Sequence, residues 1–236
     1  PRTGDIQQYF TFDVCGACDD QYTKLRILTR GTYEDLNNLI SMKIPVKNYI
    51  KKVDGFQDIS LEKCSRCELY KKCAGPVLPS KGKYNIAIVG EAPGKDEDEQ
   101  GESFVGRAGS VLWDELNKYD LYRKMFHVTN VVKCYPAKDR TPTSEQIEIC
   151  KSWLLRELEA IDARFILAFG NTSLKCFLNK DKGIMEKSGA IEWVENVGAW
   201  ICWCLHPSAV LHNPNNKQIF SDSIKVFADK IYEMRI

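Results

Sequence analysis

The sequence lacks any long hydrophobic run, and no apolar stretch approaches the roughly 18 residues that a membrane-spanning helix needs. From Pro1 onward it also lacks the succession of basic, apolar and small residues typical of a signal peptide. We therefore expect a soluble intracellular protein without membrane partners, cytoplasmic or nucleoid-associated, or nuclear or in a viral factory if the source is eukaryotic or viral. Because an initial methionine is lacking too, we expect that the chain was trimmed or cut from something longer.

An excess of charge of one sign is also lacking, since 33 Lys and Arg balance 32 Asp and Glu to give a net charge of +1. This balance does not exclude a nucleic-acid binder, because affinity for phosphates depends on a local basic patch rather than on the total charge. Internal repeats and low-complexity segments are absent from the 236 residues, of which 44% are hydrophobic. The composition predicts one α/β domain with an extra segment, or one larger domain.

From about residue 61 onward, strand patterns alternate with helix patterns. The predicted strands are 85–89, 127–132, 164–169 and 200–205. The predicted helices are 109–119, 144–161, 171–178 and about 216–234. Strands separated by helices favour a three-layer α/β/α fold with a central, mainly parallel four-stranded sheet.

Residues 1–60 show no such alternation, and we interpret them as an N-terminal extension of unknown role that precedes a domain at 61–236. One helix is predicted in the extension. It would begin at Thr32, with Asp35 completing a capping box and Leu36, Leu39 and Ile40 on one face.

The ten cysteines are many for a chain of this size that shows no sign of secretion, so metal or cluster ligation is a better expectation than disulfides. Cys64 and Cys67 form a C-x2-C pair, Cys134 follows a predicted strand and Cys150 lies in a predicted helix. These four thiols could surround one iron–sulfur cluster or, equally by ligand count, one zinc ion, with Cys73 as a substitute ligand. Apolar neighbours favour core packing for Cys176, Cys202 and Cys204, and a second pair, Cys15 and Cys18, has no assigned role.

The segment GEAPGKDEDEQGESFVGRAG, from Gly90 to Gly109, follows an apolar run that is typical of a buried strand. It would place the carboxylate of Glu91, a Pro-Gly turn and a helix start at the carboxyl end of that strand, where open α/β sheets bind ligands. Backbone N–H groups at the helix start, around Gly106 and Arg107, are suited to phosphate. The acidic residues from Asp96 to Glu99 are more typical of a solvated face.

With these residues in hand, the chain resembles the family 4 uracil-DNA glycosylases, the iron–sulfur branch of the uracil-DNA glycosylase superfamily. The resemblance covers about residues 61–235. It is carried by CSRC, by GEAPG followed by FVGRAG, by TNVVKC, by RTP ahead of the Cys150 helix and by HPSAVL, blocks that occur in this order in such proteins.

The resemblance implies a role for each matching position. Cys64, Cys67, Cys134 and Cys150 match the ligands of a [4Fe–4S] cluster. Glu91 matches the acidic residue that serves the attacking water, and Gly90 and Ala92 beside it belong to the substrate site. Phe104 matches the aromatic residue that stacks on the flipped base, Asn130 the amide that reads the pyrimidine, and His206 the histidine of the last motif. Ser208 would contact a DNA phosphate.

Three features depart from the family pattern. The first 60 residues have no counterpart in its compact members. Residues 135–139 stand where an Arg-Pro-Pro run is usual. After HPS, residues 209–213 lack the basic residue often found there. An Arg-rich insert that ends in a histidine, found in the related cross-linking branch, is absent, which argues against covalent capture of DNA.

The residue types suit hydrolysis of an N-glycosidic bond. The amide of Asn130 can donate to O4 of uracil and accept from N3–H, whereas cytosine presents the opposite pattern. His206 can donate to O2, where the leaving base gathers negative charge. We predict a monofunctional glycosylase that removes uracil from single- or double-stranded DNA. The alternatives are a non-catalytic DNA-binding module of a larger replication or repair protein, with residues 1–60 contacting a partner, and a zinc-bound structural domain.

Overall fold

The structure, a computed structural model, describes residues 9–10, 29–30, 60–138 and 140–234. The chain divides into two units, Pro1–Pro45 and Val46–Ile236. In the first unit, β1 (Tyr9–Phe10) pairs antiparallel with β2 (Thr29–Arg30). The helix predicted to begin at Thr32 and the Cys15 and Cys18 pair lie outside the described residues.

The second unit contains a five-stranded sheet with the strand order β4-β3-β5-β7-β6. Four strands are parallel and confirm the predicted sheet: β3 (Ile86–Gly90), β4 (His127–Asn130), β5 (Phe165–Phe169) and β7 (Ala199–Cys204). The fifth, β6 (Ile191–Val194), runs antiparallel to β7 at the edge. The sequence analysis missed β6 because four residues are too few to show a period, and the connecting residues 195–198 carry no two-residue hairpin signal.

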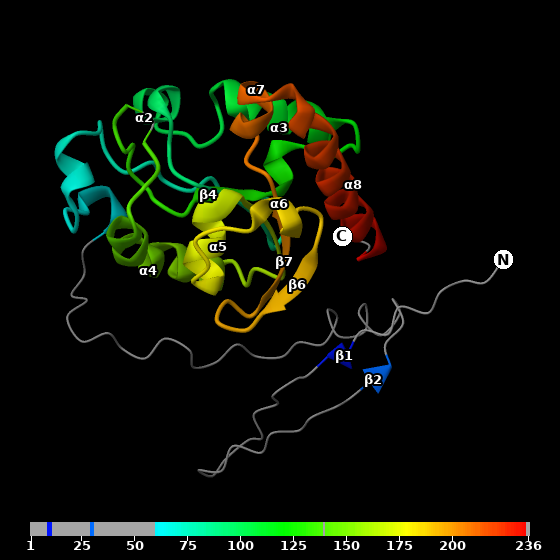
Figure 1. The fold of residues 1–236 in the computed structure, drawn as a ribbon. Helices are drawn as coiled ribbons and strands as arrows, with labels where there is room; N and C mark the ends of the chain where they lie inside the picture. The colour runs from blue at the N-terminus through cyan, green and yellow to red at the C-terminus, as the bar shows by residue number, and fades with distance from the viewer. Residues whose placement is uncertain (1–8, 11–28, 31–59, 139, 235–236) are drawn as a thin grey trace, which may run out of the picture. The chain divides into compact units, whose positions relative to one another are not determined.

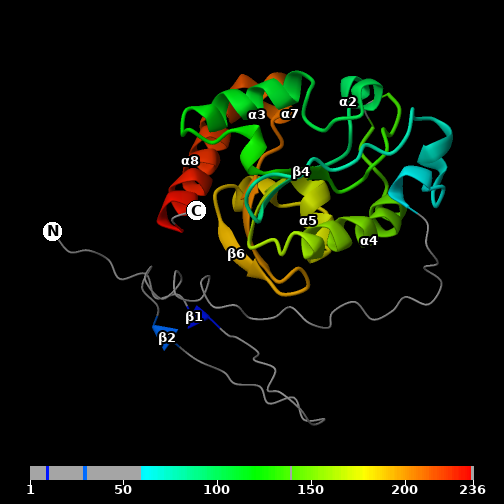
Figure 2. The same cartoon turned by 180° about the vertical axis from the view of Figure 1, so that it is seen from behind.

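Helices cover both faces of the sheet. In Figure 1, α4 (Ser144–Ala160) and α5 (Gly170–Leu178) lie on one face, while α3 (Arg107–Asn117) and α8 (Lys217–Glu233) lie on the other; Figure 2 shows the same layers from behind. The short helices are α2 (Lys95–Gln100), α6 (Ile184–Lys187) and α7 (Ser208–His212). The three-layer α/β/α expectation is therefore confirmed, and none of the helices in the described part is long and apolar enough to span a bilayer.

A parallel sheet that is covered by helices on both sides exposes neither face to water. Its central strands are therefore apolar on both faces. Every residue of β3, β5 and β7 is buried. On one face the ring of Phe165 stacks on that of Phe227 of α8, with centroids 4.9 Å apart. Core packing is also confirmed for the three cysteines that were predicted to be buried, Cys176, Cys202 and Cys204, all at 1% exposure or less.

The predicted start of α4 is confirmed in atomic detail. The Thr143 hydroxyl accepts a hydrogen bond from the Gln146 N–H at 3.2 Å, and the Gln146 side chain accepts one from the Thr143 N–H at 3.0 Å. This capping box satisfies two donors that a helix start would otherwise leave free. It fixes the first turns of α4 and, with them, the position of Cys150.

Candidate active site and cysteine centre

The site begins where two adjacent parallel strands end. Gly90 of β3 lies opposite Asn130 of β4 in the sheet register, and Glu91 directly follows Gly90. A Cβ atom at Gly90 would lie 2.2 Å from Oδ1 of Asn130 and 2.6 Å from Cζ of Phe104. Gly90 therefore contributes the space that lets the Asn130 amide and the Phe104 ring approach the strand end.

One cleft of about 820 Å³ opens at this edge of the sheet. All the residues predicted for substrate or phosphate, apart from Gly90, line it: Glu91, Ala92, Phe104, Gly106, Arg107, Asn130, His206 and Ser208. The volume falls within the range typical of small-molecule sites. Residues from four separate motifs thus meet in one place, as the expectation of a site at the carboxyl ends of the strands requires.

Phe104 is held in an unusual conformation, with a φ of 56° that side chains other than glycine rarely adopt. Its carbonyl accepts a hydrogen bond from Nε1 of Trp113 at 3.0 Å, and a Cβ at Gly109 would lie only 2.0 Å from that oxygen. The Phe104 ring lies 6.2 Å from the His206 ring at an interplanar angle of 27°. Close packing of α3 therefore fixes a flat apolar ring at the cleft.

Asn130 is buried, at 4% exposure, and its Nδ2 donates to the Ser103 hydroxyl at 3.0 Å. An amide nitrogen carries two hydrogens, so one donor and the Oδ1 acceptor stay available for a ligand. Ser103 thus restricts the rotation of the amide without using up its capacity to read a base edge.

His206 follows β7 and precedes α7. Its Nδ1 accepts the Ser208 N–H at 3.3 Å and lies 2.7 Å from the Ser208 hydroxyl. Because Nδ1 accepts from a backbone N–H, the neutral ring carries its proton on Nε2. Burial lowers the pKa of His206 to about 4, so the ring is neutral at physiological pH and acts as an Nε2–H donor.

The partner of the Glu91 carboxylate comes from the helix that follows the neighbouring strand β5. Burial raises the pKa of Glu91 above its ordinary value, and a hydrogen bond from the Thr172 hydroxyl at 2.5 Å opposes this rise. The carboxylate therefore lies in a partly water-excluded place while a donor stabilises its charge.

Glu97 corrects the expectation of a solvated acidic face over Asp96–Glu99. Glu97 is only 8% exposed, and its two carboxylate oxygens accept the N–H groups of Gly94 and Gly106 at 3.0 and 3.1 Å. Asp98 also has a partner, since both its oxygens lie 3.1 Å from the Ala74 N–H. One carboxylate therefore joins the two loops that carry Glu91 and Phe104.

Replacing Glu97 by glutamine should lower the free energy of unfolding by about 1–3 kcal/mol, because the amide nitrogen would face one of the two N–H donors and leave it unpaired. Urea denaturation measures this loss. Glu99→Gln is the matched control, since Glu99 is 64% exposed and pairs only with the exposed Lys95 of the same helix. Equal stabilities of the two variants would show that Glu97 does not hold the loops.

Of the residues predicted to contact phosphate, two have their hydrogen-bonding groups occupied and one is exposed. The Gly106 N–H donates to Glu97, and the Ser208 hydroxyl is taken up with His206, so neither group is free in this arrangement. Arg107 is exposed at the first residue of α3 and lines the cleft. Arg140 also lines the cleft and was not among the candidates. Together with Lys95, the two arginines supply cationic side chains to the lining of the cleft.

The four candidate cysteines line a second, smaller cavity, together with Tyr70 and Trp153. Cys64 ends one 3-10 turn (Leu61–Lys63) and Cys67 begins the next (Glu68–Lys71). Cys134 lies in the loop after β4, and Cys150 lies in α4. The structure thus brings together the four thiols that the sequence placed in three separate segments.

The electrostatics of this cavity suit a bound cationic centre. Burial, together with the neighbouring Cys73, Cys150 and Cys67, raises the pKa of Cys134 well above its usual range. Burial raises the pKa of Cys150 to about 11, although the Lys133 charge acts in the opposite direction. Thiols of this kind become thiolates only when a metal centre compensates their charge.

Tetrahedral zinc would bring four sulfurs to within about 4 Å of each other. In the part of the chain that the structure describes, no three His, Cys, Asp or Glu side chains are arranged to hold a single metal ion. Four thiols around one shared cavity match the ligand count of an iron–sulfur cluster and of a zinc ion alike.

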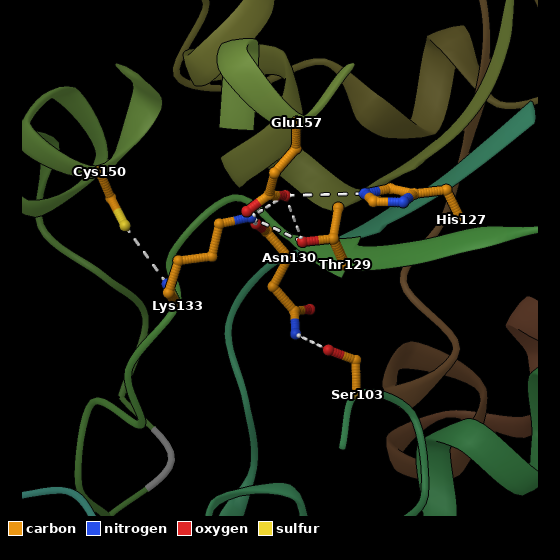
Figure 3. Close-up of polar contacts among 7 residues, drawn as sticks. All are labelled: Ser103, His127, Thr129, Asn130, Lys133, Cys150 and Glu157. Atoms are coloured by element: carbon orange, nitrogen blue, oxygen red, sulfur yellow. Dashed lines mark hydrogen bonds and ion pairs between the residues drawn. The ribbon is translucent and has the colours of Figure 1, made fainter. Parts of the chain in front are cut away.

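A buried ion pair connects the cysteine cavity to Asn130 (Figure 3). Lys133 is 1% exposed, and its ammonium donates to Glu157 at 2.7 Å, to the Thr129 hydroxyl at 2.6 Å and to the Asn130 carbonyl at 2.7 Å. The N–H of the same lysine donates to Sγ of Cys150 at 3.3 Å. Burial alone would raise the pKa of Glu157, but the Lys133 charge and hydrogen bonds from neighbours lower it instead.

Changing Glu157 to glutamine should therefore cost about 3–5 kcal/mol of folding free energy, since the Lys133 ammonium would remain buried without its counter-charge. Asp229→Asn provides the comparison, because it breaks an exposed pair with Lys225 and should cost under about 1 kcal/mol. Chemical unfolding of both variants decides the matter. A Glu157→Gln protein as stable as Asp229→Asn would mean that the pair contributes little.

Four residues around the candidates were missed in the sequence: Ser103, Glu97, Thr172 and Lys133. Each contacts a candidate residue. Three of them carry no functional pattern in their own segments, and Glu97 lies within a run of acidic residues that is typical of an exposed surface. Only a capping pattern could have signalled Glu97, which lies three residues after Gly94. The contacts of Ser103 with Asn130, of Thr172 with Glu91 and of Lys133 with Glu157 join separate segments, which no local pattern reveals.

Comparison with known proteins agrees with this geometry. A family model described as the uracil DNA glycosylase superfamily matches residues 79–228. The chain belongs to this superfamily. A type-4 uracil-DNA glycosylase of Pyrobaculum aerophilum is 34% identical over 71% of this chain and 89% of its own length. The type-4 uracil-DNA glycosylase of Archaeoglobus fulgidus is 36% identical over 69% of this chain and 85% of its own length.

Within the superfamily, the chain belongs to the type-4 branch. The predicted family is thereby confirmed. A further relative is a DNA polymerase of Bacillus phage SP01, which is 30% identical over 64% of this chain but only 16% of its own length. A segment similar to this chain thus also occurs within a longer protein named as a DNA polymerase.

Proposed function

We propose that this protein hydrolyses the N-glycosidic bond between uracil and deoxyribose in DNA and leaves an abasic site. The observation that carries the proposal is the meeting of Glu91, Phe104, Asn130 and His206 in one cleft of about 820 Å³. The names of the type-4 relatives support it. A glycosylase that acts on DNA would work inside the cell, in the cytoplasm or at the nucleoid or nucleus.

The base must leave the stack to reach these residues, because its glycosidic bond is inaccessible in a duplex. The Phe104 ring offers a flat face on which an extruded pyrimidine can stack, an interaction worth about 1–3 kcal/mol. Ala92 lies on the same cleft wall as Glu91. Asn130 then reads the base through its free amide hydrogen and Oδ1, a pattern that uracil matches and cytosine does not.

Bond cleavage sends negative charge to the base and positive charge to the sugar. The Nε2–H of neutral His206 is suited to donate to uracil O2, and a single donor of this type typically contributes about 10²–10³ in rate. The Glu91 carboxylate is suited to hold the attacking water and to stabilise the cationic sugar. The two residues therefore act on opposite charges of the same transition state.

The cysteine cavity is proposed to hold a [4Fe–4S] cluster through Cys64, Cys67, Cys134 and Cys150. When bound, such a cluster would supply structural cross-linking among the Cys64 turn, the Cys134 loop and α4, and no redox step. The four thiols line one cavity, with Cys134 and Cys150 buried and Cys64 and Cys67 half-buried, which supports this assignment. Because Cys134 lies four residues after Asn130, the same cross-link would steady the base-reading strand end.

DNA, single- or double-stranded, is the proposed partner, with Arg107 and Arg140 as its principal phosphate contacts. Residues 1–60 are proposed to form an extension, separate from the glycosylase domain at 61–236, that contacts a replication or repair protein. The family match at residues 79–228 lies wholly within the second region, which supports this division.

A DNA-binding module without catalysis is the second candidate, favoured by the relative in which a matching segment forms part of a DNA polymerase. Product analysis separates the two. The protein is incubated with an oligonucleotide that contains one uracil. The proposed activity gives free uracil and a strand that breaks only after alkali treatment. Binding without uracil release would favour the module, and strand breakage without alkali would contradict a monofunctional enzyme.

A further inference from the structure

Thr172 lies directly beside Glu91 although 81 residues separate them in the sequence. Glu91 follows β3, and Thr172 lies in the first turn of α5, which directly follows β5; β3 and β5 are parallel neighbours in the sheet. Gly170 makes this possible, since its φ of 73° is a conformation that suits glycine and lets α5 begin at once after the strand. The order of the strands therefore places the Thr172 hydroxyl next to the Glu91 carboxylate.

The contact is specific to one hydroxyl. The Thr172 hydroxyl donates to Oε2 of Glu91 at 2.5 Å, and Thr172 itself is 3% exposed. The next residue, Ser173, is 0% exposed, and its hydroxyl has no hydrogen-bond partner among the described residues. Of these two adjacent buried hydroxyls, only that of Thr172 contacts Glu91.

A hydroxyl that donates to a carboxylate favours the charged form of the acid and fixes its orientation. With Oε2 held by Thr172, Oε1 is left to accept a hydrogen bond from a water in the cleft. We propose that Thr172 is a positioning residue for Glu91, which holds the carboxylate in the orientation and charge state that water activation needs. This inference rests on the proposed uracil excision.

The pH dependence follows from the surroundings of Glu91. Burial raises the pKa of Glu91 and the Thr172 hydrogen bond lowers it, so loss of the hydroxyl should raise this pKa further. His206 does not interfere, because its pKa is lowered to about 4 and the ring stays neutral while Glu91 titrates. The other titratable groups that line the cleft are Lys95, Asp96, Glu97, Arg107, Arg140 and His212.

The test compares Thr172→Val, which keeps the shape and removes the hydroxyl, with Thr172→Ser, which keeps a hydroxyl. Single-turnover uracil release is measured from pH 5 to 9. In Thr172→Val the acidic limb of the profile should move upward by about one pH unit, with a tenfold loss of rate below it. Thr172→Ser and the control Ser173→Ala should keep the wild-type limb, and the protein concentration that gives half the maximal single-turnover rate should change little in all three.

Two results would overturn the proposal: a Thr172→Val profile that matches wild type, or a rate loss that is equal at every pH, which would indicate packing alone. If Thr172→Val does not fold, the same profile is recorded for Thr172→Ala. Failure of the proposed function would look different, because wild-type protein would then release no uracil at any pH. As a further check, adding Thr172→Val to Glu91→Gln should change the rate by less than twofold.

Discussion

Asn130→Ala should lower the rate of uracil release by about 10²–10⁴. The substitution removes both the donor and the acceptor that read the pyrimidine edge, and each lost hydrogen bond to a buried partner costs about 1–3 kcal/mol. Because Asn130 contributes its side chain to the cleft and only its carbonyl to Lys133, the backbone contact survives. The variant should therefore stay folded and still bind DNA.

Single-turnover kinetics on a uracil oligonucleotide measure this effect, with a DNA-binding titration alongside. Asn117→Ala is the matched control, since Asn117 is an exposed asparagine at the last residue of α3. Its rate should equal that of wild type. If Asn130→Ala released uracil as fast as this control, the base would have to be read by other residues.

Cys150→Ser should cost the protein its iron. Serine is a poor ligand for an iron–sulfur cluster, and three cysteines would then have to hold the cluster proposed for four. We expect wild-type protein purified without oxygen to be brown and to contain about four iron atoms per chain. The variant should be colourless or nearly so and should unfold at a lower temperature, because the Cys64 turn and α4 would no longer be cross-linked.

Iron analysis, visible absorbance and thermal unfolding provide three independent readouts for this change. Cys176→Ser is the control, because Cys176 is 1% exposed and lies outside the lining of the cysteine cavity. That variant can lose stability but should retain its iron. A colourless wild-type protein that contains one zinc ion per chain would contradict the cluster assignment.

The sequence predicted the four parallel strands and the candidate residues of the cleft because these belong to local patterns, whereas β6 and Arg140 do not. Glu91 directly follows an apolar run and Asn130 lies within a predicted strand, and parallel strands that end together bring such residues to one edge. His206 and Phe104 entered through motifs that resemble a known family. The structure places all four on one cleft, although their assigned roles stay predictions.

The contacts that support the candidates could not be predicted, for identifiable physical reasons. Thr172 contacts Glu91 only because β5 lies beside β3 in the sheet. The order of the strands cannot be predicted from the sequence of either segment. Glu97 carries a charge typical of surface residues. Only the structure shows that it is buried and that it accepts the N–H groups of Gly94 and Gly106. Lys133 is fully buried, and its counter-charge, Glu157, lies 24 residues away in α4. The sequence around Lys133 therefore does not show that the lysine has a partner.

The central claim is that the cleft around Glu91 excises uracil, and one measurement tests it most directly. Uracil release is followed from single- and double-stranded oligonucleotides with anaerobically purified wild-type protein and with Glu91→Gln. We expect wild-type protein to release uracil from at least one substrate, and Glu91→Gln to be slower by about 10²–10⁴ while binding DNA equally well. Equal rates for the two proteins, or DNA binding by wild type without any release, would contradict the claim.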